Sequence, residues 1–187
     1  EGKFAEAVKE FDTAIQQGAS GPGVLVGRAQ ALAATGAHTE AADAWVSAQA
    51  AIDKAVPGPD TTSRAITAFA GRAHALNELG RHEEALSVAE KGMMVKTGST
   101  PRSDSDSVAL QCEAGDALLG LSRPADAEKR FKMAVKMAPS SSRAKAGVAA
   151  ASAGAQSGST GAAGGGAPAK PASSTPAAKK AAPAKTT

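Results

Sequence analysis

Hydrophobic residues recur at helical spacing along most of the first 150 residues. Near the start of the chain, Phe4, Val8 and Phe11 fall at positions i, i+4 and i+7, which is the pattern of one buried helix face. Short segments that open with a small residue and carry Ala five positions later then return at intervals. They align without gaps: Gly2–Val8, Gly36–Ala42, Gly80–Leu86 and Ser122–Glu128. The chain therefore predicts an array of repeated helical units.

Each unit predicts a helix, a tight turn and a second helix. The matching segments Gly27–Leu32 and Gly71–Leu76 precede the second and third turns. A Gly at the turn suits a helix C-terminus, where a positive φ is needed. Further core positions follow at equal offsets: Phe11 with Ala14, Trp45 with Ala48, Ala89 with Gly92, and Phe131 with Ala134. In the fourth unit Ser122 replaces the turn Gly, and Pro124 stands in the first helical turn, where proline is tolerated.

These residues resemble the tetratricopeptide repeat family. The shared features are the turn Gly, an acidic residue followed by Ala, an aromatic residue four positions on and Ala three further on; the fourth unit adds Gly115 and the closing proline of Met137-Ala-Pro139. The resemblance covers residues 1 to about 151 and implies an all-α fold, a right-handed α-solenoid of helix-turn-helix repeats. Composition agrees, because 47 alanines against five aromatic residues exclude an all-β fold.

The spacing of the units varies. Gly2 and Gly36 are 34 residues apart, the period of the family, whereas Gly36 to Gly80 is 44 and Gly80 to Ser122 is 42. We expect the extra residues after the second helices, around 55–60 and 96–103. Longer units of this kind are similar to the kinesin light chain type of repeat, which implies an interaction scaffold.

The two ends of the array differ from the complete units between them. The first unit has only its second helix, so we expect upstream sequence to cover its apolar face. Residues 140 to about 151 predict a final helix that is N-capped by one of Ser140 to Ser142. Residues 1–151 then form the repeat domain, and residues 152–187, which contain no large apolar side chain, form a disordered low-complexity tail.

Charge is also unevenly distributed along the chain. Residues 1–128 hold all 18 acidic residues and 11 of the 21 basic ones, whereas residues 129–187 hold ten basic residues and no acid. Basic tails of this kind contact acidic surfaces such as nucleic acid, an anionic membrane or a cytoskeletal polymer such as a microtubule. A solubilising linker is the equally open alternative for this tail. The candidate contacts are Lys170, Lys179, Lys180 and Lys185.

Little in the sequence favours catalysis, a metal or a cofactor. Cys112 is the single cysteine and cannot form an internal disulfide, and no Cys/His group has zinc-ligand spacing. His38 and His82 follow the turns, where packing or capping is the expected role. Gly161–Gly166 lacks the strand, helix and Gly-Lys-Ser/Thr ending of a phosphate loop. No apolar stretch is long enough to span a bilayer.

The family resemblance implies a concave groove lined by the first helix of each unit. The candidate groove residues are Gln30, Ala33, His74, Asn77, Cys112 and Asp116. Val26, Ala70 and Cys112 stand where chaperone-binding members carry basic clamp residues, so a clamp for a terminal carboxylate is not expected. A mild, faintly acidic groove suits a partner helix or peptide with small apolar and basic groups; a neighbouring helix of the same protein could equally fill it.

The sequence therefore predicts a non-enzymatic protein-interaction scaffold within a larger assembly. The alternative is an assembly or cytoskeleton-associated protein whose basic tail binds a polyanion. A cytoplasmic or cytoskeletal location is expected, with an organelle as the alternative because the chain does not begin with Met.

Overall fold

The computed structural model describes residues 2–95 and 105–159, and this part of the chain consists of helices joined by short turns. The helices are α1 (Gly2–Gln16), α2 (Pro22–Ala34), α3 (His38–Lys54), α4 (Pro59–Glu78), α5 (His82–Met94), α6 (Ser105–Gly120), α7 (Pro124–Met137) and α8 (Ser142–Ser159). No β-strand occurs in the described residues. The expected all-α repeat architecture is confirmed.

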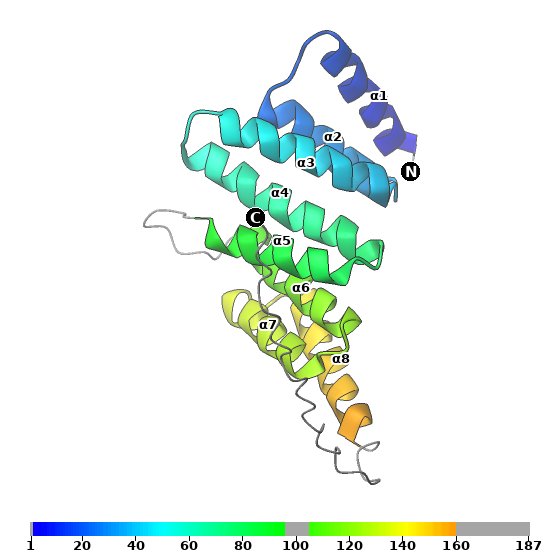
Figure 1. Ribbon diagram of the computed structural model, residues 1–187, viewed down its shortest axis with the longest axis vertical. Helices are drawn as coiled ribbons and strands as arrows, with labels where there is room; N and C mark the ends of the chain where they lie inside the picture. Colours follow the sequence, from blue (N-terminus) through cyan, green and yellow to red (C-terminus); the bar gives the residue numbers. More distant parts are fainter. Residues whose placement is uncertain (1, 96–104, 160–187) are drawn as a thin grey trace, which may run out of the picture.

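The helices stack in chain order into an elongated array that runs from α1 to α8 (Figure 1). Each helix packs on the next one along the chain, and α2, α4, α6 and α8 also contact one another in turn. Among these eight helices, α1, α3, α5 and α7 make no such contacts with one another. The first helices of the units therefore form the inner layer, and the second helices form the outer layer.

The turns between first and second helices share one geometry. Gly36 and Gly80 adopt φ of 80° and 71°, and Ser122 takes the same left-handed conformation with φ of 57°. In each turn the backbone N–H of this residue bonds back three positions, and the next N–H bonds back five, as in Arg123 to Leu118 at 2.8 Å. These two hydrogen bonds satisfy the last carbonyls of the first helix. Ser122 therefore occupies a conformation that suits Gly better.

Close approach of the helices depends on glycine beneath aromatic rings. A Cβ on Gly71 would lie 2.3 Å from Cζ2 of Trp45, and one on Gly147 would lie 2.2 Å from Phe131. The alanines at the matching positions of the units are expected to lie between helices: Ala41, Ala85 and Ala127 are fully buried, whereas Ala7 of α1 is only half-buried. The small residues thus set the separation of the helices, as the sequence predicts.

The third unit, which lacks the usual aromatic residue, fills the space differently. Ala89 and Gly92 are buried, and a Cβ on Gly92 would lie 2.7 Å from both Phe69 of α4 and Leu110 of α6. Large side chains from the two inner helices therefore occupy the volume that an aromatic residue on α5 would fill. Because these two side chains fill the space of the missing aromatic ring, the core stays continuous in the third unit.

The extra residues of the longer units lie partly in helices. Only four residues, 55–58, separate α3 from α4, and these two helices have 17 and 20 residues. The second expected insertion, 96–103, lies outside the described residues.

The last helix extends past the expected end of the repeat domain. The Ser141 hydroxyl accepts a hydrogen bond from the Ala144 N–H at 3.3 Å, which confirms the predicted cap. Helix α8 runs on to Ser159, eight residues beyond Ala151. Ala151 is fully buried, and the Ser152 hydroxyl donates to Glu128 of α7 at 3.3 Å, so the first tail residues pack on the body. Residues 160–187 lie outside the described part.

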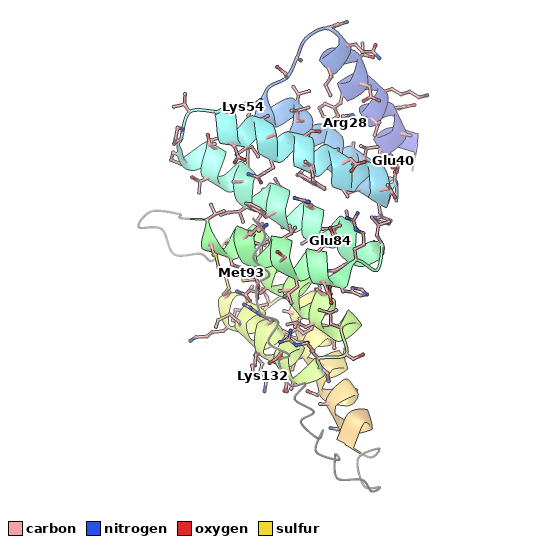
Figure 2. All side chains as sticks on the ribbon, viewed as in Figure 1. Arg28, Glu40, Lys54, Glu84, Met93 and Lys132 are labelled. Atoms are coloured by element: carbon pink, nitrogen blue, oxygen red, sulfur yellow. The ribbon has the colours of Figure 1, made fainter. Side chains whose placement is uncertain are left out.

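Helix α1 packs on α2 by one side only. An ion pair of 2.6 Å joins Asp12 to Arg28 (Figure 2), yet α1 contains no fully buried residue, and Phe4 is 50% exposed. The expected upstream helix remains a prediction. Within the described residues, no helix is long and apolar enough to cross a membrane.

Candidate functional site

A hollow of about 310 Å³ opens on the inner layer of the array. Its lining residues come from five helices: Gln30, Trp45, Thr67, Ala70, Gly71, His74, Asp106, Ala109, Glu113 and Arg143. Four of them, from Thr67 to His74, follow the i, i+3, i+4, i+7 spacing of one face of α4. Asp106, Ala109 and Glu113 form the corresponding face of α6. The hollow is therefore built on regular helix faces, which hold its side chains in fixed positions.

The floor of the hollow combines small residues with one indole. Ala70 and Gly71 let the chain of α4 lie close to the Trp45 ring. Trp45 is 2% exposed, and its Nε1 has no hydrogen-bond partner among the described residues. A buried indole N–H without an acceptor is costly, and Nε1 is itself fully buried, so it lies beneath the floor and does not face an incoming group.

One wall of the hollow is a network of charges around Glu113. The Glu113 side chain is 3% exposed, and its Oε1 lies 2.7 Å from Nη2 of Arg143 and 3.4 Å from Nδ1 of His74. The Asn77 amide donates to Glu113 Oε2 and to its backbone carbonyl, both at 3.0 Å. Arg143 Nη2 also lies 2.7 Å from Asp116. The network ties α4, α6 and α8 together.

The network shifts the pKa values of its members. Burial alone would raise the pKa of Glu113, but the hydrogen bond from His74 and the charge of Arg143 outweigh it and lower the pKa. The hydrogen bond to Glu113 raises the pKa of His74 above its ordinary value. Burial raises the pKa of Asp116, and Arg143 offsets this only in part. Glu113 is therefore an anion already neutralised by its own neighbours.

Asp106 is the carboxylate of the hollow that is available to a ligand cation. One of its carboxylate oxygens accepts a hydrogen bond from the Thr67 hydroxyl, and no cation pairs with it among the described side chains. Gln30, on the opposite side, is exposed, and its amide has no hydrogen bond to any other residue that the structure describes. Among the described residues, the hollow thus offers one carboxylate without a cationic partner and one exposed amide around a floor of small residues.

The structure sorts the six groove candidates into three groups. Gln30 and His74 line the hollow, and Asn77 and Asp116 support its wall. Ala33 packs against the core cluster of α2 and α3. Cys112 is 1% exposed and packs beside Phe131 in the core, so it does not line the groove.

The groove candidates from the sequence include only two of the lining residues, Gln30 and His74. Thr67, Ala70 and Gly71 precede His74 by whole helical turns, so extending the His74 stripe backwards would have found them. Asp106 and Glu113 precede Asp116 in the same manner. Arg143 carries no comparable signal, because it approaches from the final helix only after the array is folded.

The arrangement offers little for catalysis. Burial raises the pKa of the Cys112 thiol, which keeps it protonated, and His74 bonds to Glu113 instead of a nucleophile. The His82 ring packs over Gly120 and faces Asn77 at 3.5 Å, and the His38 ring lies edge-on to His74 at 6.2 Å. Within the described residues, no group of three His, Cys, Asp or Glu side chains is placed to hold a metal ion.

A second hollow, of about 340 Å³, lies between α5 and α7 on the outer layer. More basic than acidic side chains line it, but each of these cations is already paired with a carboxylate. Arg130 lies 2.9 Å from Glu90. Arg123 and Lys129 lie 2.8 and 2.9 Å from Asp126. Arg130 also contacts the sulfur of Met93, labelled in Figure 2, at 3.6 Å. This surface has no unpaired charge comparable to Asp106.

Comparison with known proteins agrees with this architecture. A tetratricopeptide repeat family model matches residues 1–58 and 112–164. A crystal structure of a TPR-like protein from Chlorobium tepidum TLS superposes with a TM-score of 0.60 at 24% identity, covering 74% of this chain and 94% of that one. A search of curated proteins gives no match. The kinesin light chain type of repeat stays a prediction. Since the family model spans more than half of the sequence, the chain belongs to the tetratricopeptide repeat family.

Proposed function

We propose that this protein is a non-enzymatic interaction scaffold that holds an extended segment of a partner protein in the inner hollow. The partner segment carries small apolar and basic side chains. The observation that carries this proposal is the carboxylate of Asp106, which has no cationic partner among the described side chains, beside a floor of Ala70, Gly71 and Ala109. Members of this repeat family are generally protein-interaction scaffolds, which supports the same role.

The polar groups of the hollow suit a peptide backbone. The Gln30 amide can donate to a backbone carbonyl and accept from a backbone N–H. Asp106 would receive a lysine or arginine side chain. The small residues of the floor favour a segment rich in alanine, glycine or serine, because larger side chains would hold its backbone away from these groups.

The alternative, a polyanion-binding protein, has weaker support. Four of the six basic residues described beyond position 128 are ion-paired with carboxylates of the body: Lys129, Arg130, Lys132 and Arg143. Their charge is therefore largely neutralised before any polyanion arrives. The four tail lysines lie outside the described residues, and their role as a polyanion contact remains a prediction.

Fluorescence anisotropy with two labelled synthetic peptides tests the scaffold proposal. The probes are four repeats of Ala-Ala-Lys and the matched four repeats of Ala-Ala-Glu. The full chain should bind the lysine peptide and leave the glutamate peptide free. Gln30→Arg, which places a bulky cation in the hollow without removing any hydrogen bond within the protein, should weaken binding of the lysine peptide about tenfold or more.

Two pairs of variants localise the interaction. Ser87→Arg places the same cation on the exposed face of the outer helix α5 and should leave binding unchanged. Asp106→Asn should weaken binding, whereas Asp43→Asn on the exposed face of α3 should not. Equal affinity in Gln30→Arg and Ser87→Arg would contradict the hollow as the binding site.

A further inference from the structure

We propose that the segment 160–187 of this same chain docks in the inner hollow and competes there with the partner. The inference rests on the proposed function, because it assigns an occupant to the same surface. The segment follows α8 directly and lies outside the described residues. Its docking would make the affinity of the scaffold for partners depend on the state of its own C-terminal region.

Composition makes this segment the kind of ligand that the hollow suits. Apart from its lysines it contains only Ala, Gly, Pro, Ser and Thr, and it has no acidic residue. The tetrapeptide Ala-Pro-Ala-Lys occurs twice, at 167–170 and 182–185. Proline favours an extended backbone, which leaves the carbonyls free to accept hydrogen bonds from groups such as the Gln30 amide.

The positive charge of the segment also complements the acidic hollow. The segment carries Lys170, Lys179, Lys180 and Lys185. The hollow presents the carboxylate of Asp106, which has no cationic partner among the described side chains. The other acids of its wall, Glu113 and Asp116, are already paired with Arg143. A tail lysine thus has one preferred carboxylate in the hollow.

The length of the segment is sufficient. Arg143 lines the hollow near the start of α8, and Ser159 ends that helix 16 residues later, about 24 Å away at the helical rise. The 11 residues from Ser159 to Lys170 span up to about 36 Å when extended. Lys170 therefore reaches back to the hollow, and the residues beyond it are available to cross the hollow toward α2.

Competition against the Ala-Ala-Lys peptide tests the proposal in the full chain. A variant in which all four tail lysines are replaced by alanine should bind this peptide about threefold more tightly or better than the unchanged chain, because an intramolecular competitor has been removed. The matched control replaces Lys3, Lys9, Lys54 and Lys91, exposed lysines outside the hollow lining, with alanine and should leave the affinity unchanged.

Carbodiimide cross-linking locates the contact. In a mixture of ¹⁴N- and ¹⁵N-labelled full chains, the tail lysines should form amide cross-links to Asp106 within single chains. Asp106→Asn should abolish these cross-links, Asp43→Asn should not, and 1 M NaCl should reduce them.

Each other outcome overturns the inference. Cross-links that join ¹⁴N to ¹⁵N chains would assign the hollow to the tail of a second copy. Equal peptide affinity with and without the tail lysines, or cross-links spread evenly over exposed carboxylates, would remove the tail from the hollow and leave the scaffold proposal standing. Absence of peptide binding to both proteins would contradict the scaffold proposal as well.

Discussion

The guanidinium Nη2 of Arg143 lies 2.7 Å from Oε1 of Glu113, and this contact joins α8 to the middle of the inner layer. Glu113 is 3% exposed, so its charge cannot be solvated by water. Arg143 is itself 46% exposed and also touches Asp116. One arginine of the last helix thus neutralises a buried carboxylate, in addition to the packing of that helix on α7.

Removing this arginine should destabilise the array. Arg143→Met leaves Glu113 with only His74 and Asn77, and we expect a loss of about 1–3 kcal/mol in the free energy of unfolding, measured by urea denaturation. Glu113→Gln in the same chain should restore part of the loss, because it removes the uncompensated charge.

The matched control for Arg143 is Arg81→Met. Arg81 lies 2.7 Å from Glu84 on the surface of α5 (Figure 2), and exposed ion pairs contribute little to stability. Equal destabilisation by the two substitutions would mean that the burial of Glu113 is not what makes Arg143 important.

Ser122 should be a site where glycine improves the fold. Its φ of 57° costs a serine about 1–2 kcal/mol, whereas glycine adopts it freely but loses more entropy on folding. We expect Ser122→Gly to raise the free energy of unfolding by about 0.5–1 kcal/mol. The reverse change, Gly80→Ser, should destabilise a turn of the same geometry. Destabilisation by Ser122→Gly would show that the serine hydroxyl compensates for the strain.

Ala85 should tolerate no larger side chain. It is fully buried among core residues of α4, α5 and α6, so Ala85→Leu should overpack the helices and cost about 1–3 kcal/mol. Ala50→Leu, on the exposed side of α3, is the matched control and should melt with the unchanged chain. Wild-type thermal stability in Ala85→Leu would contradict the repeat register.

The sequence predicts the array well because its signals are local. A turn residue with positive φ, a buried alanine five positions later and an aromatic ring over a glycine each constrain neighbouring backbone, and they repeat. The end of α8 is different. Its composition resembles that of the tail, and only the contacts of Ala151 and Ser152 with the body show that helix continues there.

The site is harder to predict because it depends on how helices face one another. Cys112 precedes Asp116 by four residues and Glu113 by one, yet only Glu113 turns toward the hollow, while the thiol turns toward Phe131. Both positions lie within about 60° of Asp116 around a helix, so the sequence alone does not choose between them. The packing of α6 between α4 and α8 makes that choice.

The pair of His74 and Glu113 should give the fold a pH dependence near neutrality. Because the hydrogen bond to Glu113 raises the pKa of His74, protonated His74 stabilises the folded state. This contribution is complete below the unfolded-state pKa of about 6.5 and is lost as the pH rises through the higher folded-state pKa. Unfolding free energies measured by urea denaturation from pH 6 to 8 should therefore decline, and His74→Gln, whose amide can still donate to Glu113, should flatten the decline. His82→Gln is the control and should retain it, because the His82 ring faces the amide of Asn77 instead of a carboxylate. If the free energy of unfolding declines equally in His74→Gln, another group is titrating. The His74–Glu113 contact then does not contribute to the pH dependence of stability.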